Sequence, residues 1–257
     1  MKLYSKIYGD KAQDLIVIHG LFGMSDNWNS LGRKFSEYFR VHLIDLRNHG
    51  RSPHSVNFNY DVMCEDLIEY MLNHNIQKPI ILGHSLGGKV AMKFAFTFPK
   101  KIEKLLVADI SPREYNSDFY KSILAVLYKI PLEEFDKREE IDSLLSSLYE
   151  DKGMRLFLMK NLYRDENKKF AWRFNIEILL DKIENIQEAN FIKGICNVST
   201  HFIKGGNSNY ITNEDRLIID KHFSDFGITN IDGAGHWLHA EEPQKFYNEV
   251  IAICGYH

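Results

Sequence analysis

The chain has 257 residues, of which 44% are hydrophobic and 26% are charged. This composition can bury a sizeable core and excludes an intrinsically disordered chain, and the length suits one α/β domain that carries an insertion. The formal net charge of -3 argues against nucleic acid and against anionic membranes as partners.

The N-terminus and the cysteines narrow the class of protein further. The first 14 residues contain no apolar segment of the kind found in secretory signals, and no run approaches the roughly 18 apolar residues that span a bilayer. Cys64, Cys196 and Cys254 lie far apart and have neither metal-ligand nor disulfide spacing. We therefore expect a soluble, cytoplasmic protein, monomeric or dimeric, with no stable membrane insertion and no metal.

Short apolar runs alternate with helical patterns in the first part of the chain. The expected strands are residues 15–18, 41–44, 79–82 and 105–108. The expected helices are residues 28–38, 60–72 and 86–98. Strands that are apolar almost throughout are typical of a parallel sheet buried on both faces. The alternation predicts an α/β fold with a mostly parallel sheet and helices on both sides.

This alternation stops after residue 112. Residues 113–189 show only helical periodicity, with many large apolar side chains and no strand-like run. Strands and helices alternate again afterwards, at residues 198–203, 213–223, 228–231 and 241–254. We predict an α/β core made of residues 1–112 and 190–257, interrupted by an all-helical cap at residues 113–189.

The run Gly83-His84-Ser85-Leu86-Gly87 matches the pattern G-x-S-x-G between an apolar strand and a helix. That setting predicts a nucleophile elbow, a tight turn that projects the Ser85 hydroxyl from the edge of the sheet at a helix N-terminus. A serine that only caps the helix is the plain alternative. A phosphate-binding loop is disfavoured, because Val90 stands where the Mg²⁺-binding Ser or Thr would be.

A nucleophilic serine needs a base, and His236 is the best placed of the 11 histidines. It follows the last expected strand in a loop of small residues, so its ring can reach the edge of the sheet where sites in α/β folds lie. A metal pair of His236 with His239 lacks a third ligand, and His239 reads as a helix-surface neighbour. We expect the N–H groups of Leu21 and Leu86 to bind the oxyanion, with Phe22 as the second choice to Leu21.

The sequence offers more than one position for the acidic partner of His236. The loop after the strand at residues 198–203 contains Asn207 but no carboxylate. Asp109 ends the strand that follows the nucleophile helix and lies between Ser85 and His236 in sequence, so it is the candidate acid. The alternatives are that Asp109 caps the turn into Ser111-Pro112, or that Asp215 or Glu214 is the acid. Asp45 and Arg47, in another loop, are expected to form a structural ion pair.

Several stretches of the sequence resemble one known family. They are HGLFGMSDNW, DLRNHGRSPHS, GHSLGGKVAM, VADISP, FIKGGNSNYI and GAGHWLHAEEP. Together they resemble the YbfF-type bacterial esterases and their mitochondrial relatives, the abhydrolase-domain-containing protein 11 group, over essentially the whole chain. The resemblance implies an α/β-hydrolase fold with a helical cap, no cofactor, and Asp109 as the acid.

The expected function is hydrolysis of a small-molecule carboxylic ester or acyl thioester through an acyl-enzyme on Ser85, with His236 and Asp109 completing a triad. The alternatives are an acyl-CoA thioesterase, a carbon–carbon bond hydrolase with the same triad, and a non-catalytic receptor for small molecules.

Overall fold

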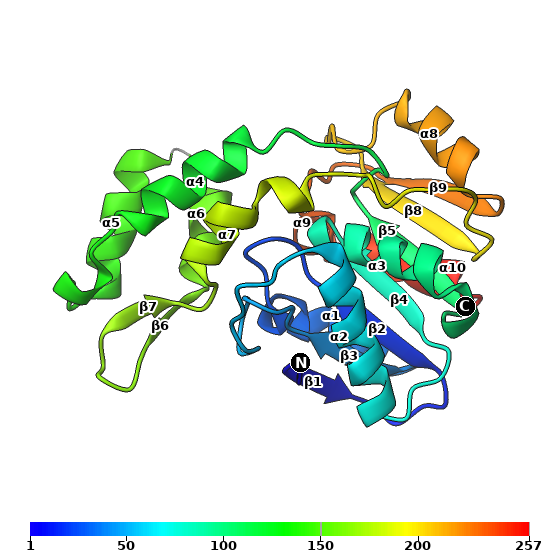
Figure 1. Ribbon diagram of the computed structural model, residues 1–257, viewed down its shortest axis with the longest axis horizontal. Coiled ribbons are helices and arrows are strands. Elements are labelled where there is room, and N and C mark those ends of the chain that lie inside the picture. Colours follow the sequence, from blue (N-terminus) through cyan, green and yellow to red (C-terminus); the bar gives the residue numbers. More distant parts are fainter. Residues whose placement is uncertain (150, 257) are drawn as a thin grey trace.

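One seven-stranded sheet forms the centre of the structure, a computed structural model that describes residues 1–149 and 151–256 (Figure 1). Its strands lie in the order β1-β3-β2-β4-β5-β8-β9, and all neighbours are parallel except β1 and β3. The strands are β1 (Ser5–Tyr8), β2 (Asp14–Ile18), β3 (Arg40–Ile44), β4 (Ile80–His84), β5 (Lys104–Ala108), β8 (Thr200–Gly205) and β9 (Phe226–Ile231). The expected α/β class with a mostly parallel sheet is confirmed.

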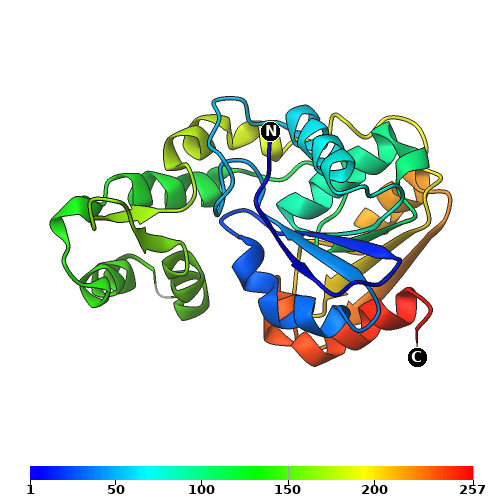
Figure 2. The same ribbon diagram turned by 90° about the horizontal axis from the view of Figure 1, so that it is seen from below.

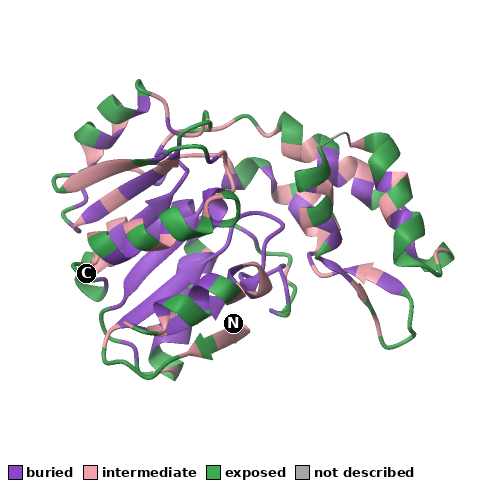
Figure 3. Ribbon diagram, turned by 180° about the vertical axis from the view of Figure 1, so that it is seen from behind, coloured by how far each residue is buried: buried purple, intermediate pink, exposed green. Residues whose placement is uncertain are grey.

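Helices cover both faces of the sheet (Figure 2). One face carries α2 (Tyr60–Asn73), α3 (Leu86–Thr97) and α8 (Asp215–His222); the other carries α1 (Asn29–Phe35) and α10 (Pro243–Ile253). Successive strand residues point to opposite faces, so Ile16 and Ile18 join the core below α2 and α3, whereas Leu15 and Val17 join the core below α1 and α10. Both sides of each central strand are therefore buried (Figure 3), which explains the continuous apolar runs.

The chain leaves the sheet between β5 and β8 to form a lobe of its own at residues 113–189 (Figure 1). Its helices are α4 (Asp118–Tyr128), α5 (Arg138–Leu148), α6 (Lys152–Met159) and α7 (Ile176–Lys182). We call residues 113–189 the inserted segment. Their limits as a separate domain stay a prediction.

The inserted segment is not all-helical, as the sequence pattern led us to expect. It contains a two-stranded antiparallel sheet of β6 (Leu162–Arg164) and β7 (Phe170–Trp172). In the turn between them, the Asp165 carboxylate accepts hydrogen bonds from the backbone N–H groups of Asn167 (2.9 Å) and Lys169 (2.8 Å), and Lys168 has a φ of 63°. Strands of three residues are too short to show a period of two, which is why the pattern missed them.

Strand β1 was also missed, because it is half-exposed and has no apolar run. Four short 3-10 helices and one further helix complete the described residues. They are η1 (Ser25–Trp28), η2 (Pro99–Lys101), η3 (Leu132–Glu134), η4 (Glu184–Ile186) and α9 (Leu238–Glu241). In the residues that the structure describes, none of the helices has both the length and the apolar character needed to cross a membrane.

The carboxyl ends of the parallel strands β2, β4, β5, β8 and β9 meet at one edge of the sheet, as parallel strands must. The loops that follow these strands carry all the candidate site residues, and the inserted segment lies beside the same edge (Figure 1). Open α/β sheets place their sites at such an edge.

Candidate active site

Ser85 occupies the turn between β4 and α3 with a φ of 51° and a ψ of -117°, a conformation that side-chain-bearing residues rarely adopt. The turn is closed by a hydrogen bond from the Ser85 N–H to the Ala108 carbonyl oxygen (3.0 Å). It also needs glycine on both sides. A Cβ on Gly83 would lie 2.2 Å from the Gly87 oxygen, and a Cβ on Gly87 would lie 2.3 Å from the Ile18 oxygen. The strained elbow expected from G-x-S-x-G is therefore present.

His236 lies between the serine and an aspartate. Its Nε2 is 3.1 Å from Ser85 Oγ, and its Nδ1 is 2.7 Å from Asp109 Oδ2. Because a carboxylate only accepts hydrogen bonds, the proton belongs on Nδ1, which leaves Nε2 free to accept the serine proton. The loop that carries His236 is held by Glu241, whose carboxylate accepts from the N–H groups of Gly235 (2.6 Å) and Trp237 (3.1 Å). Sequence reasoning did not identify Glu241.

Asp109 follows β5 with a φ of 49° and is fully buried. Besides His236, its carboxylate accepts from the Gly205 N–H (2.9 Å) and from the Ser208 hydroxyl. The Asp109 carboxylate therefore bonds to residues at the edge of the sheet. The alternative, in which Asp109 only caps the turn into Ser111-Pro112, does not fit these bonds.

Asp215, the alternative acid, and Asn207, in the loop where a carboxylate was sought, both have partners other than His236. Asp215 accepts from the Thr212 N–H (2.7 Å) and forms an ion pair with Arg113 (2.9 Å). The Asn207 side chain donates to the Gly233 carbonyl oxygen (3.2 Å). Of the side chains considered from the sequence, Asp109 is the carboxylate that the fold brings to His236.

The two predicted oxyanion donors flank the serine. Leu86 is the first residue of α3, so the helix offers no carbonyl acceptor to its N–H. Leu21 lies in the turn after β2, which is closed by a hydrogen bond from the Gly23 N–H to the Gly20 carbonyl oxygen (2.9 Å). Neither the Leu21 nor the Leu86 N–H donates a hydrogen bond to another described residue. Phe22, the second choice to Leu21, has a φ of 61°.

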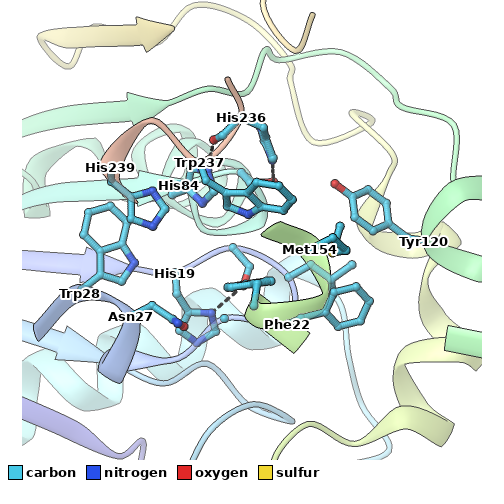
Figure 4. A pocket seen from close by; sticks show the side chains of 15 residues that line it. His19, Phe22, Asn27, Trp28, His84, Tyr120, Met154, His236, Trp237 and His239 are labelled. Carbon is cyan, nitrogen blue, oxygen red and sulfur yellow. Dashed lines mark hydrogen bonds between the residues drawn. The ribbon is translucent and has the colours of Figure 1, made fainter. Parts of the chain in front are cut away.

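Two cavities meet at Ser85 and Leu21. The larger measures about 410 Å³ with the space at its mouth that is open to solvent, and it is bordered by His236 (Figure 4) and by Phe157 of the inserted segment. The smaller measures about 300 Å³ in the same way and is bordered by Leu86, Ile110 and Ile186. Tyr120 of α4 borders both, and its hydroxyl is hydrogen-bonded to that of Tyr210. The site therefore has a separate space on each side of the serine.

The model of the α/β hydrolase fold family matches residues 15–243, which are most of the chain. The chain belongs to the α/β hydrolase fold family. A solved structure of a marine microorganism esterase is 39% identical and superposes with a TM-score of 0.95, covering 98% of this chain and 99% of that chain. The family implied by the sequence motifs is thus confirmed.

Two relatives match the resemblance stated from the motifs. Esterase YbfF of Escherichia coli is 31% identical over 236 residues, which are 92% of this chain and 91% of that protein. The sn-1-specific diacylglycerol lipase ABHD11 of Mus musculus is 33% identical over an alignment of 258 positions, which covers 97% of this chain and 84% of that protein. This α/β hydrolase is therefore a hydrolase that acts on esters.

Two expectations about loop residues of this hydrolase were wrong. Arg47 does not pair with Asp45. Its guanidinium donates to both carboxylate oxygens of Asp66 on α2 (2.7 and 2.8 Å), while Asp45 accepts from the N–H groups of Ser25 (2.5 Å) and Arg51 (2.8 Å). The bonds to Asp66 and Ser25 join this loop to distant segments, which a local sequence motif cannot reveal.

His239 is buried, with 6% of its surface exposed, and is not the helix-surface residue expected. Its ring stacks on Trp28, with centroids 4.1 Å apart. Burial lowers the pKa of His239 to about 3 and that of His19 to about 4, and it lowers the pKa of His84 as well. These three rings are neutral, and that of His84 packs beside the His236 ring, with centroids 4.9 Å apart. Among the residues described, no three His, Cys, Asp or Glu side chains form a potential metal site.

Lys89 was considered in the sequence only as the lysine of the disfavoured phosphate-binding loop, and its contacts could not be predicted there. It lies on α3 one turn after Ser85, and it is buried. Its Nζ donates to the carbonyl oxygens of Gln187 and Glu188 (2.8 Å each) and lies over the Tyr115 ring. Burial lowers the pKa of Lys89 to about 7. Lys89 thus ties the end of the inserted segment to the helix that follows the serine.

Proposed function

We propose that this chain is a serine esterase that cleaves carboxylic esters through an acyl-enzyme on Ser85. The observation that carries the proposal is the series of hydrogen bonds from Ser85 Oγ to His236 Nε2 (3.1 Å) and from His236 Nδ1 to Asp109 Oδ2 (2.7 Å). A serine is a weak nucleophile unless a base removes its proton, and a base in this arrangement can do so.

In the first step, His236 Nε2 takes the hydroxyl proton as Ser85 Oγ attacks the ester carbonyl carbon. Asp109 keeps the Nδ1 tautomer and stabilises the imidazolium that forms. The carbonyl oxygen becomes an oxyanion, which the N–H groups of Leu21 and Leu86 bind; one such donor is worth roughly 100- to 1000-fold in kcat. His236 then protonates the alcohol oxygen, the C–O bond breaks, and the acyl group remains on Ser85.

In the second step, His236 removes a proton from a water molecule, which attacks the acyl-enzyme carbonyl. The tetrahedral intermediate uses the same oxyanion donors. When it collapses, His236 returns a proton to Ser85 Oγ and the carboxylic acid leaves. Because His19, His84 and His239 are neutral, none of these three rings opposes the positive charge that forms on His236 during this cycle.

The two cavities divide the substrate. The alcohol oxygen must take its proton from His236, so the alcohol portion occupies the 410 Å³ cavity that His236 borders. The acyl group then occupies the 300 Å³ cavity, whose border includes the apolar side chains of Leu86, Ile110 and Ile186.

The inserted segment acts as the cap of this esterase. Phe22 follows Leu21 in the loop after β2, and its ring contacts that of Phe174 (centroids 5.1 Å apart). The Phe22 carbonyl oxygen accepts a hydrogen bond from the Asn161 side chain (2.7 Å). Phe157 of the inserted segment packs against Trp237, the residue after His236, with ring centroids 5.8 Å apart. A segment that touches both the loop of Leu21 and the loop of His236 can control which substrates enter.

The test is a panel of esters with graded acyl length, in which each oxygen ester is matched by the thioester of the same acid. We expect hydrolysis of the short-chain oxygen esters by the wild type and none above background by Ser85→Ala. Turnover of thioesters alone would reassign the chain as a thioesterase. If no ester or thioester is cleaved while carbon–carbon substrates or mere binding are detected, the esterase proposal is wrong.

A further inference from the structure

Three residues border both of the cavities that meet at the site: Ser85, Leu21 and Tyr120. The proposed function uses Ser85 as the nucleophile and Leu21 as an oxyanion donor, and it gives no role to Tyr120. Tyr120 belongs to α4 of the inserted segment and is only half-buried, so its side chain is accessible. Because the reacting ester group must lie where the acyl and alcohol cavities meet, Tyr120 is placed to touch it.

The Tyr120 side chain is held at its ring and at its hydroxyl. The ring packs against that of Phe22, the residue after Leu21, with centroids 6.2 Å apart. The hydroxyl is hydrogen-bonded to the hydroxyl of Tyr210, whose own ring packs on His236. Figure 4 shows the Tyr120 hydroxyl pointing from α4 across the cavity, toward the side where His236 lies. The hydroxyl is therefore positioned beside the proposed base before an ester binds.

The two tyrosine hydroxyls carry two protons but share a single hydrogen bond. Burial raises the pKa of both Tyr120 and Tyr210, so both hydroxyls stay protonated at neutral pH. Neither hydroxyl bonds to a further residue in the described part of the chain, so one O–H is left to donate. Tyr120 borders the larger cavity and Tyr210 does not. The arrangement that serves an ester is therefore Tyr210 donating to Tyr120, and Tyr120 donating into the cavity.

Of the two oxygens of an ester, the alkoxy oxygen is the one that needs a further donor. In the proposed function the carbonyl oxygen receives the N–H groups of Leu21 and Leu86. The alkoxy oxygen must lie where His236 can protonate it, which is the side to which the Tyr120 hydroxyl points. Negative charge grows on this oxygen as the C–O bond breaks. A donor placed there binds the transition state more strongly than the bound ester, and such a difference raises the rate.

We propose that Tyr120 is a further catalytic residue, whose hydroxyl donates a hydrogen bond to the alkoxy oxygen of the ester as the alcohol leaves. In this step the C–O bond breaks, its electron pair stays on the alkoxy oxygen, and His236 Nε2 supplies the proton. Tyr120 keeps its own proton throughout. Esters of aliphatic alcohols, which are poor leaving groups, depend most on this bond. The inference rests on the proposed function, because it takes Ser85 as the nucleophile and His236 as the acid.

The test varies the leaving alcohol while the acid stays the same. Ethyl, trifluoroethyl and para-nitrophenyl esters of one short acid are compared by kcat/KM, which reports acylation. Tyr120→Phe removes only the hydroxyl. The ratio of kcat/KM for the ethyl ester to that for the nitrophenyl ester should fall by roughly tenfold, because one hydrogen bond to a developing alkoxide is lost. The nitrophenyl ester, whose leaving group is stable as an anion, should change little, and the trifluoroethyl ester should lie between.

Two matched variants remove a tyrosine hydroxyl at other positions. Tyr128→Phe is on the same helix, where Tyr128 is 55% exposed and borders neither cavity, and it should keep the wild-type ratio. Tyr210→Phe leaves the Tyr120 hydroxyl in place and should also keep the ratio within a few-fold. A ratio that falls in Tyr210→Phe but not in Tyr120→Phe would overturn the inference, because Tyr210 would then be the donor. Thermal unfolding of each variant checks that it is folded.

The pattern across the three esters separates catalysis from support of the fold. If Tyr120→Phe lowers kcat/KM by the same factor for every ester, the hydroxyl only positions the inserted segment, and the inference is wrong while the esterase stands. An unchanged kcat/KM for every ester overturns it as well. If the wild type cleaves none of the esters and a fluorophosphonate does not label Ser85, the proposed function fails and the role of Tyr120 fails with it.

Discussion

The ring of Tyr210 stacks on the ring of His236, with centroids 3.7 Å apart and 15° between the ring planes. Tyr210 belongs to the core, but two residues of the inserted segment hold it. Its hydroxyl is hydrogen-bonded to that of Tyr120, and its carbonyl oxygen accepts from the Tyr115 hydroxyl (2.5 Å). The inserted segment therefore reaches the proposed base through one aromatic ring.

This stack predicts a role for the Tyr210 ring in orienting His236 and in stabilising its charged form. An aromatic face next to a cation contributes about 0.5–2 kcal/mol, so Tyr210→Leu should lower kcat by roughly tenfold. Tyr210→Phe keeps the ring and should stay close to wild type. Steady-state kinetics on one short ester measure both, with thermal unfolding as the check on stability. Equal kcat values for Tyr210→Leu and wild type would show that the ring only fills space.

Ser85 should be the residue that becomes covalently modified. The elbow places its Oγ beside His236 and beside the N–H groups of Leu21 and Leu86, which donate to no other described residue. A fluorophosphonate probe should label the wild type but not Ser85→Ala, and peptide mapping by mass spectrometry locates the adduct. Ser208, which bonds to Asp109, is the informative control: Ser208→Ala should still be labelled. An adduct on another serine would falsify the assignment.

The parts of the fold that the sequence predicted well are those with strong local signals. The buried strands have continuous apolar runs; Ser85 and Asp109 follow directly after two of them, and His236 lies in the loop after β9. Because parallel strands end at one edge, three positions far apart in the chain could be expected to meet there. The structure brings the three side chains within 3.1 Å of their neighbours in the series.

The parts that could not be predicted depend on contacts between distant segments. Arg47 looked like the partner of Asp45 two residues away, yet its partner Asp66 lies on α2. His239, three residues after His236, looked like a helix-surface neighbour, but α9 packs it against Trp28. Lys89 appeared in the sequence only as part of a disfavoured phosphate-binding loop, and only the fold shows that it donates to two carbonyl groups of the inserted segment.

The smaller cavity should set acyl-chain length. Ile186, in the inserted segment, is buried and borders this cavity. Ile186→Phe should therefore shift the acyl optimum to shorter chains, while the rate of labelling by a small fluorophosphonate stays within a few-fold of wild type. Met154→Phe, on the border of the larger cavity, is the matched variant and should alter the preference for the alcohol portion instead. Unchanged acyl profiles in Ile186→Phe would mean that acyl chains do not enter this cavity.

Buried histidines should make the fold sensitive to acid. Burial lowers the pKa to about 4 for His19, about 3 for His49 and about 3 for His239, below the unfolded value of about 6.5. Between these values the unfolded chain binds more protons than the folded one, so the free energy of unfolding falls as the pH drops below about 6.5. Each histidine contributes about 1.4 kcal/mol per pH unit.

Urea unfolding at pH values from neutral to about 4.5 measures this slope. His49→Phe, which removes one of the buried groups, should make it shallower, whereas His54→Phe, at an exposed position, should not. A slope that is the same in wild type and His49→Phe would mean that His49 is protonated in the folded state or remains buried in the unfolded state.

Asp109 is the carboxylate that the fold brings to His236. Its substitution should show whether Asp109 orients the His236 ring or only supports the fold. Asp109→Asn keeps the shape, but an amide at this position no longer holds the Nδ1 tautomer or stabilises the imidazolium, so kcat should fall by as much as roughly 10⁴-fold. Asp215→Asn is the control, because Asp215 pairs with Arg113 and not with His236. It should reduce thermal stability and leave kcat within a few-fold of wild type. The reverse pattern, an inactive Asp215→Asn beside an active Asp109→Asn, would contradict the assignment. Since Asp109 also accepts from the Gly205 N–H at 2.9 Å, Asp109→Asn needs a circular dichroism spectrum beside its kinetics, and a native spectrum with lost turnover is the result that identifies Asp109 as the orienting carboxylate.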